Sequence, residues 1–517
     1  MGTTESRPCV VIDPGSGVLK YGIASQETLG RIKADAEAAI AAAGSGEGDG
    51  GDGASGGGAG GAGIGEGKDG DAPLFHTIPA VIGRRLKAGE KRPEDGVVTW
   101  SAWFGSLLGG GAEEEREWIG QEALDDAERE NLVLYYPTEE AQVKPDGWPA
   151  LKKLFAHLFD KLSVADDLAN HNVLLTEPPM SSNDNRLMFM RMILGKPGDV
   201  GERSFPGGGF GCAGFWMGTQ AVLAKVGYDV PRAAPLETAM VLDVGDGLSH
   251  VIPVHHNVPM LAQARQVKLA GRHVTVAFER VLAKEHGLRF ERSRQREAAR
   301  MLKERVAVVP TATPGEDGAA EGVEDVDVPS EPVEMVDNLP IPAGLCGEGN
   351  VAGLPLKRVS AQARWSCGDL LFAPSHPRYR DFMDPETVSV SRLVLEQIKA
   401  SPSELRDGLR TIVLSGGTTL MRGFAERLRR DVEAGLGTGR KVTVLCDPGR
   451  HGLVYRGAVA MAVEYIKDPK PEEEHDAKAK LHKWMTAAEF DDRRERKDGV
   501  LLWCFADKCG PTPTTLR

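Results

Sequence analysis

Two stretches of the chain repeat one pattern of apolar and polar residues. Residues 9–24 read CVVIDPGSGVLKYGIA, and residues 240–254 read MVLDVGDGLSHVIPV. In each stretch an apolar run ends in an aspartate, Asp13 or Asp243, a D-x-G-x-G turn follows, and a second apolar run leaves the turn. Two apolar runs joined by a tight glycine turn are typical of a β-hairpin. The sequence therefore predicts two equivalent hairpins, each led by an aspartate.

Elsewhere the apolar positions predict helices and strands in alternation. Residues 151–162 and 183–193 carry apolar side chains at helical spacing, and residues 423–432 form a third helical pattern. Residues 172–176 and 411–414 are short apolar runs typical of buried strands. Strands alternating with helices around two repeated hairpins predict an α/β protein with a duplicated core.

A glycine-rich insert at about residues 34–70 interrupts this pattern. The stretch from Gly44 to Gly70 contains 15 glycines and almost no large apolar side chain. Such a segment cannot bury enough surface to offset its ordering entropy, so a disordered surface insert is expected. An alanine-rich short helix over residues 31–43 is expected to lead into it. The G-x-G-x-x-G match at residues 65–70 follows no strand and is rejected as a nucleotide motif.

A second insert, at about residues 310–332, is acidic and rich in proline and glycine. This composition predicts a solvated surface loop. A docking tail for a basic partner is the alternative.

Composition narrows the classes of function. The chain has 517 residues, enough for two to four domains, and 62 basic against 75 acidic residues, a formal charge of −13. This acidic balance argues against direct nucleic-acid binding. Because no apolar stretch approaches the ~20 residues of a membrane-spanning helix, no membrane span is expected. Seven scattered cysteines without a CxxC pair indicate free thiols in a reducing cytoplasm.

The repeated hairpins suggest a ligand. Glycine lets the backbone approach a ligand closely and direct N–H groups toward it. Mg²⁺ prefers carboxylates, phosphate oxygens and retained waters. Two hairpins led by Asp13 and Asp243 could therefore clamp a phosphate chain and its Mg²⁺ from both sides. One D-x-G-x-G turn would be weak support, but its repetition in matching contexts predicts nucleotide binding.

The order of motifs along the chain resembles that of actin and the actin-related proteins. The segments that carry the resemblance are residues 13–22, 75–84, 118–123, 136–137, 174–186, 220–223, 243–253, 269–275, 300–305, 371–374, 415–423 and 484–499. The resemblance implies an α/β, two-lobed actin-like ATPase fold, in which duplicated RNase H-like domains hold ATP in the cleft between them. Hsp70 chaperones and sugar kinases share that core but lack the LLTEPP segment and the Trp-Met-Thr tail pattern.

The resemblance also implies a domain organisation. Residues 1–180 would form the first lobe, with a smaller subdomain at about residues 85–117. Residues 181–440 would form the second lobe, and residues 441–517 would return to the first.

The same resemblance implies the roles of individual residues toward ATP and Mg²⁺. Asp13 and Asp243 would hold Mg²⁺ through waters, Gln220 would orient the attacking water, and His250 would lie near that water. Asp243, Gln220 and His250 are thus the candidate catalytic residues. Nucleotide contacts are implied for Gly15, Ser16, Gly17, Val18, Lys20, Gly245, Asp246, Gly247, Leu248, Gly271, Arg300, Lys303, Glu304, Gly416, Gly417 and Thr418.

Plain structural roles remain open for several of these residues. Gln220 could be a core glutamine bonded to backbone, His250 a satisfied structural histidine, and Lys20 a surface lysine. Arg300, Lys303 and Glu304 share one helix face, as they would on an ordinary salt-bridged surface.

Several positions depart from the family pattern. They are Pro14, Val244, His273, Leu420, Met421 and His451. These changes keep the carboxylates and the backbone cradle but remove side-chain contacts to the nucleotide. Weak ATP binding, and slow hydrolysis at most, are therefore expected.

Smaller details resemble the actin-related protein 2 subfamily, whose members belong to the complex that starts actin branches. They are the Thr-Glu-Pro-Pro-Met run at residues 176–180 and the stretch from Asp447 to Thr486. The expected function is an ATP-binding cytoskeletal subunit that contacts actin and other complex subunits in the cytoplasm. The alternatives are a nuclear subunit of a chromatin-remodelling complex and a divergent filament-forming actin. The segment 85–117, with LLGGG at residues 107–111, replaces the loop that actin filaments need, so self-polymerisation is not expected.

Overall fold

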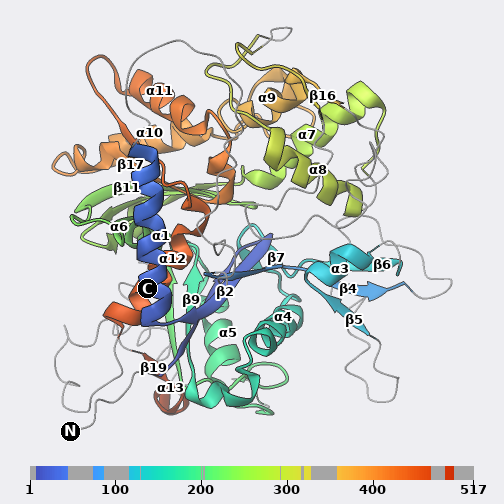
Figure 1. Cartoon of the computed structure of the whole chain (residues 1–517), viewed down its shortest axis with the longest axis vertical. Coiled ribbons are helices and arrows are strands. Elements are labelled where there is room, and N and C mark those ends of the chain that lie inside the picture. Colours follow the sequence, from blue (N-terminus) through green and yellow to red (C-terminus); the bar gives the residue numbers. More distant parts are fainter. Residues whose placement is uncertain are drawn as a thin grey trace.

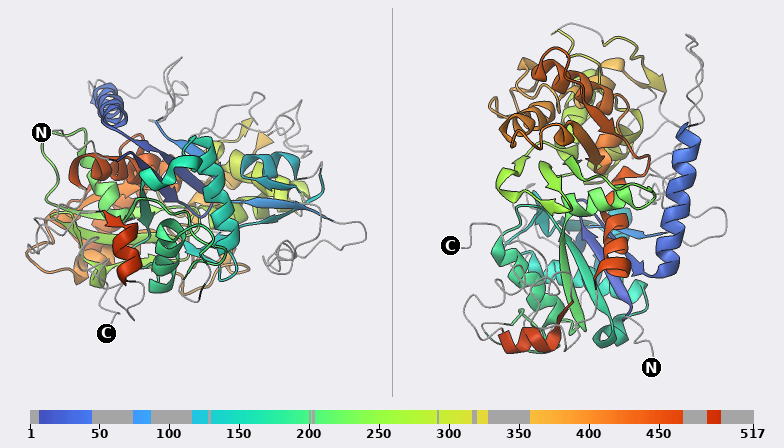
Figure 2. Two further views of the ribbon diagram at one scale, coloured as in Figure 1. Left: turned by 90° about the horizontal axis from the view of Figure 1, so that it is seen from below. Right: turned by 90° about the vertical axis from the view of Figure 1, so that its left-hand side faces the viewer.

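The computed structural model describes residues 7–44, 74–86, 116–127, 130–199, 201, 204–290, 293–315, 320–327, 358–466 and 484–493. Two lobes lie one above the other, with a small sheet beside the lower lobe (Figure 1). Each lobe has a central sheet with helices packed on it (Figures 1 and 2).

The sheet of the lower lobe has the strand order β19-β10-β9-β1-β2-β3. Its strands are β1 (Cys9–Pro14), β2 (Val18–Ala24), β3 (His76–Pro79), β9 (Asn172–Glu177), β10 (Gly214–Thr219) and β19 (Met485–Thr486). The helices of this lobe include α4 (Trp148–Lys161), α5 (Asn183–Leu194) and α13 (Ala487–Arg493). The apolar positions predicted for residues 151–162 face the core, since Leu151, Leu154, Phe155, Leu158 and Phe159 are fully buried.

The sheet of the upper lobe has the order β13-β12-β11-β17-β18, with β14 paired to β12. Its strands are β11 (Thr238–Val244), β12 (Ser249–His255), β13 (Val258–Pro259), β14 (Arg265–Val267), β17 (Thr411–Ser415) and β18 (Thr443–Leu445). The helices of this lobe are α7 (Gly271–His286), α8 (Ser293–Val306), α9 (Ala361–Asp369), α10 (Val390–Ala400) and α11 (Phe424–Leu436).

The two lobes repeat one arrangement around the predicted hairpins. In the lower lobe β1 pairs with β2 so that Asp13 lies opposite Lys20, and β9 runs parallel on the other side of β1. In the upper lobe β11 pairs with β12 so that Asp243 lies opposite His250, and β17 runs parallel to β11. The core is therefore duplicated at the level of strand register.

Two strands belong to a different lobe from the one that the predicted domain limits give them. Strand β10 pairs with β9 in the lower sheet although it follows residue 180, because the β9–α5–β10 segment is a crossover between parallel strands. Strand β18 belongs to the upper sheet although it follows residue 440. Further along the C-terminal segment, β19 pairs with β10 of the lower sheet.

A small three-stranded sheet, of order β5-β4-β6, projects from the lower lobe. Its elements are β4 (Ile82–Arg85), β5 (Glu117–Ile119), β6 (Leu132–Tyr135) and the adjoining helix α3 (Gln121–Asp126), followed by the hairpin of β7 (Thr138–Glu139) and β8 (Gln142–Val143). Most of the expected subdomain at residues 85–117, including LLGGG at residues 107–111, lies outside the described residues.

Helix α1 (Gln26–Gly44) contains the alanine-rich helix expected at residues 31–43 and begins earlier. It lies beside α12 (Leu453–Ala460), as both views show (Figures 1 and 2). Its side chains Leu29, Ile32 and Ala36 are buried, and Lys33 pairs with Glu464 at 2.7 Å. The start of the expected insert at residue 34 therefore falls within a packed helix, while residues 45–70 lie outside the described residues.

The acidic insert is attached to the upper lobe where it is described. Arg427 donates to the carbonyl of Pro310 at 3.1 Å, and Arg378 donates to that of Pro314 at 2.7 Å. Further on, β15 (Val326–Asp327) pairs with β16 (Arg358–Val359). Residues 311–312, 315, 321–322 and 324–325 are exposed, as a solvated surface loop requires, while arginines of the upper lobe bind backbone carbonyls of the insert. Composition alone does not show these partners.

Helices α6 (Gln220–Asp229) and α12 join the two lobes. Helix α6 packs on strands β11, β12 and β17 of the upper sheet, and α12 packs on β1, β2 and β9 of the lower sheet. The two helices cross at Gly227 and Gly457, where a Cβ on Gly457 would lie 1.9 Å from the carbonyl oxygen of Leu223. Only glycine allows this close approach of the two backbones.

Replacing Gly457 by Ala should lower the free energy of unfolding by about 1–3 kcal/mol, because the new methyl group meets immobile backbone. Gly30→Ala is the matched control. Nothing lies within 4 Å of a Cβ at Gly30 in helix α1, so that change should stabilise the protein slightly. Urea unfolding compares the two variants. Wild-type stability in Gly457→Ala would show that the crossing is not tight.

Among the described residues, no helix is both long and apolar enough to cross a membrane.

Candidate functional site

The two hairpin aspartates are held by matching hydroxyl groups. Asp13, at the end of β1, accepts a hydrogen bond from the hydroxyl of Thr176 on the parallel strand β9. Asp243, at the end of β11, accepts one from Ser415 Oγ on the parallel strand β17 at 2.5 Å. Each carboxylate is thus oriented by its neighbouring strand and keeps further lone pairs for a ligand. Neither hydroxyl was assigned a role from the sequence.

Opposite each aspartate lies a nitrogen-bearing side chain. Lys20 Nζ is 4.0 Å from Asp13 Oδ2, so this lysine faces the hairpin carboxylate. His250 is buried, and burial lowers its pKa against the opposing charge of Asp243, so the imidazole is neutral at pH 7. Its Nε2 is buried and has no hydrogen-bond partner among the described residues. A buried polar atom without a partner indicates room for a ligand or water.

Gln220 reaches the first aspartate. Its Nε2 donates to Asp13 Oδ1 at 3.2 Å and approaches Thr176 Oγ1 at 3.4 Å. Because Gln220 is the first residue of α6, the helix that joins the lobes, its amide lies at the carboxylate instead of bonding to core backbone. The alternative of a core glutamine bonded to backbone is therefore not what the structure shows.

The two glycine turns face each other across the lobes. A Cβ on Gly17 would lie 3.4 Å from Asp246 Cγ, and one on Gly247 would lie 3.2 Å from Ser16 Oγ. Ser16 Oγ also accepts a hydrogen bond from the backbone N–H of Ala141 at 3.0 Å. Side chains larger than hydrogen at the two glycines would crowd the facing turn.

Backbone bonds set the shape of each turn. In the first, Gly15 N donates to Asp13 O at 3.0 Å, and Val18 begins strand β2. In the second, Gly245 N donates to Leu248 O at 3.1 Å. The turn residues predicted from the two D-x-G-x-G motifs are thus brought together by the structure.

A third loop, after β17, closes over the second turn. Gly416 has a φ of 89°, and a Cβ there would lie 2.3 Å from Val244 O, so this position requires glycine. Thr418 Oγ1 and Gly271 N both donate to the carbonyl of Gly245, at 2.7 and 3.0 Å. Gly417 lies between Gly416 and Thr418 in the same loop, and a Cβ there would have no atom within 4 Å. The predicted residues Gly271, Gly416, Gly417 and Thr418 therefore gather at the second hairpin.

The predicted nucleotide contacts on helix α8 form ion pairs within the helix. Arg300 pairs with Glu297 and with Glu304, the latter at 2.6 Å, both on its own helix. Lys303 is buried, with its Nζ 3.7 Å from Glu304. Among the described residues, these three form no hydrogen bond or ion pair with either hairpin turn. Their ion pairs fit the alternative of a salt-bridged helix face, but the buried Lys303 does not fit an exposed surface.

His273, one of the departures from the family pattern, lies in the first turn of helix α7. Its Nδ1 accepts a hydrogen bond from Ala270 N at 3.2 Å, which requires an unprotonated ring nitrogen. Burial, and then the charge of Arg272, lower the pKa of His273 below its usual value. The histidine therefore caps the helix in its neutral form.

This neutral cap predicts a pH dependence. The unfolded state binds a proton at an ordinary histidine pKa of about 6.5, while folded His273 resists protonation, so stability falls as the pH drops through that value. In His273→Asn the amide oxygen can still accept from Ala270 N but does not titrate. Urea unfolding between about pH 7.5 and 5.5 should show a shallower loss for the variant. Identical slopes would mean that His273 is not linked to folding.

Comparison with known proteins shows the family of this chain. The family model described as Actin matches residues 4–464. The chain belongs to the actin family. It is 28% identical over 354 residues to an actin-like protein of Neurospora crassa, covering 68% of this chain and 80% of that protein. It is 24% identical over 359 residues to actin-related protein 2 of Saccharomyces cerevisiae, covering 69% and 75%.

Membership in the actin family confirms the predicted α/β actin-like ATPase fold. Actin-family proteins in general bind ATP with Mg²⁺. The residues of this chain fit such a ligand, since two oriented carboxylates, a nearby ammonium and a partnerless buried imidazole nitrogen meet at two glycine turns. Carboxylates suit Mg²⁺, and an ammonium suits phosphate.

Proposed function

We propose that this actin-family chain binds Mg²⁺–ATP between its two hairpins. The observation that carries the proposal is the repeated pair of an aspartate and a hydroxyl, Asp13 with Thr176 and Asp243 with Ser415. Two such pairs at equivalent strand positions place oriented carboxylates on both sides of the facing turns.

Different residues of the two hairpins would bind the Mg²⁺ ion and the phosphates. Asp13 and Asp243 would hold Mg²⁺ through water, and Lys20 would balance phosphate charge. Backbone N–H groups of residues 15–18 and 245–248 would complete the cradle, with Ser16 adding a hydroxyl. Bound Mg²⁺ would supply charge neutralisation for the phosphates. Residues 271 and 416–418 would close the site over the second hairpin, and we keep residues 300, 303 and 304 as outer contacts.

Hydrolysis would be slow. Gln220, which bonds to Asp13, and the neutral His250 would orient the attacking water, since each side chain can form a hydrogen bond to it. Neither is a strong base at neutral pH. Val244 is buried and apolar where a hydroxyl would add a phosphate contact, so the site is better suited to holding a nucleotide than to rapid turnover. The nucleotide would then set the relative position of the lobes.

We further propose that the protein is a cytoskeletal subunit of a complex that nucleates branched actin filaments. The similarity to yeast actin-related protein 2, at 24% identity, supports this role. A nuclear subunit of a chromatin-remodelling complex and a divergent filament-forming actin are the competing functions. Actin and the other subunits of such a complex are the expected partners, and the cytoplasm is the expected location.

Sedimentation separates the subunit from the filament. With ATP, Mg²⁺ and salt at micromolar concentration, the purified chain should stay in the supernatant, because a complex subunit needs no repeating head-to-tail contact with its own copies. Conventional actin in a parallel tube is the positive control. Affinity purification from cells should then recover actin-related and unrelated subunits. Pelleting of the purified chain would favour a divergent actin, and recovery of nuclear remodelling subunits would favour the nuclear alternative.

A further inference from the structure

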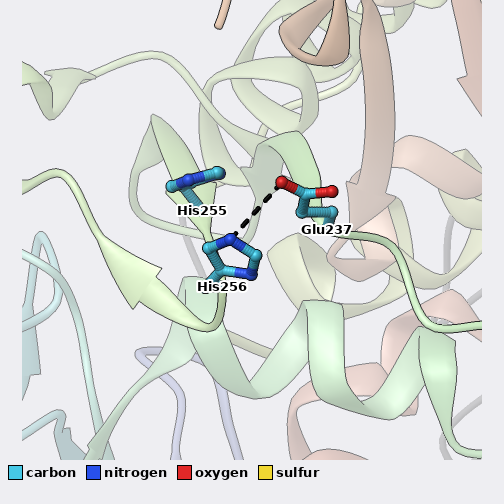
Figure 3. Close-up of side chains that lie close together, drawn as sticks. All are labelled: Glu237, His255 and His256. Atoms are coloured by element: carbon cyan, nitrogen blue, oxygen red, sulfur yellow. Dashed lines mark ion pairs between the residues drawn. The ribbon is translucent and has the colours of Figure 1, made fainter.

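Three metal-binding side chains converge at the end of the upper sheet that is remote from the hairpin turn. Glu237 precedes β11, His255 ends β12, and His256 begins the turn into β13 (Figure 3). One ligand atom from each lies within 4.8 Å of the other two. Asp243 lies five residues beyond Thr238 on β11, about 17 Å away at the usual rise of a strand, so this cluster is separate from the nucleotide site.

The backbone holds the two histidines in place. His256 and Asn257 have φ values of 48° and 59°, as in the tight turn that joins two antiparallel strands. His256 N donates to Glu237 O at 2.8 Å, which ties the turn to the start of β11. The buried Lys225 donates to Asn257 Oδ1 at 2.8 Å and to Asp229 at 2.7 Å, which anchors the turn on helix α6. The turn that carries His256 is therefore held in place, while the side chains of Glu237 and His256 are 69% and 65% exposed.

The side chains are also positioned. Thr238 Oγ1 lies 2.6 Å from His255 Nδ1, and this bond fixes the orientation of the ring. Metal-binding histidines commonly bond through their second nitrogen to a neighbouring oxygen in this way. His256 Nε2 lies 3.3 Å from Glu237 (Figure 3). The ion pair joins His256 and Glu237, and the His255 ring adds a third ligand atom because it lies against the His256 ring, with the centroids 4.2 Å apart.

We propose that Glu237, His255 and His256 bind a Zn²⁺ ion. Two imidazoles and one carboxylate are a common ligand set of zinc sites that keep a fourth position for water. Harder cations such as Mg²⁺ prefer oxygen ligands, so this cluster has a different metal preference from the proposed nucleotide site.

Zinc titration of the full chain tests the site. The protein is treated with chelator, dialysed, and titrated with ZnCl₂ against a chromogenic chelator. We expect one zinc ion per chain, with an affinity at least about tenfold lower in His255→Gln, His256→Gln and Glu237→Gln. His286→Gln is the matched control, since His286 also lies beside a glutamate, 3.7 Å from Glu285, but belongs to no cluster of three ligands among the described residues.

Cobalt spectroscopy identifies the donors. Co²⁺ in the wild type should give visible ligand-field bands without the charge-transfer band of a thiolate, and the bands should disappear in His256→Gln. Circular dichroism establishes that each variant is folded. The proposal is wrong if the wild type binds no zinc, if the three variants bind as the wild type does, or if a thiolate band appears.

Discussion

Replacing Arg186 by Met should lower the free energy of unfolding by about 3–5 kcal/mol. Arg186, on α5, donates from Nε and Nη2 to the two carboxylate oxygens of Glu177, at 2.7 and 2.9 Å. Both side chains are buried. Methionine fills similar volume but leaves Glu177, at the end of β9, buried without its cation. Breaking a buried ion pair is far more damaging than never having one.

An exposed ion pair provides the control for this prediction. Arg392 and Glu396 pair at 2.6 Å on α10, with both side chains more than half exposed. Because such pairs contribute about 0–1 kcal/mol, Arg392→Met should change stability little. A double variant, Arg186→Met with Glu177→Gln, should recover much of the loss, since it removes the uncompensated charge. Equal effects of Arg186→Met and Arg392→Met in urea unfolding would contradict the prediction.

The stability of Arg186→Met should depend on pH in a way that identifies Glu177 as the cause. Burial raises the pKa of Glu177, and the charge of Arg186 opposes that rise. Without Arg186, folded Glu177 binds a proton at a higher pH than the unfolded chain does. The folded state then gains protons on acidification, so the defect of Arg186→Met should shrink as the pH falls.

The elements that position the site were predictable from local pattern. Both hairpins follow from a D-x-G-x-G turn between apolar runs, and helix α4 follows from its apolar spacing at residues 151–162. These signals are local, because a tight turn or one buried helix face is encoded within a few residues. Thr176 and Ser415 were missed as partners of the aspartates. Each directly follows an apolar run within its strand, as Asp13 and Asp243 do, but their role depends on which strands pair in parallel.

Other contacts could not be predicted from the sequence because they depend on long-range packing. The carbonyls of the acidic insert bind Arg378 and Arg427, which lie more than 50 residues further along the chain, and no local composition reveals such partners. The contact of Gly227 with helix α12 likewise depends on tertiary packing. Arg300 and Glu304 are the reverse case, since their i,i+4 spacing predicts the ion pair that the structure has.

The proposed nucleotide site is tested most directly by thermal unfolding with and without Mg²⁺–ATP. Three variants are compared with the wild type, namely Asp13→Asn, Asp243→Asn and the control Asp407→Asn, whose side chain is exposed and pairs with Arg410. Asparagine can keep the hydrogen bonds from Thr176 and Ser415 while removing the charge that Mg²⁺ requires.

Ligand at roughly 100 times its Kd stabilises the folded state by about 3 kcal/mol. The account therefore predicts a raised melting temperature with Mg²⁺–ATP in the wild type and in Asp407→Asn. It predicts little or no rise in Asp13→Asn and Asp243→Asn, with unchanged melting in the absence of nucleotide. A wild type that shows no shift at millimolar Mg²⁺–ATP, or hairpin variants that shift as the wild type does, would contradict it.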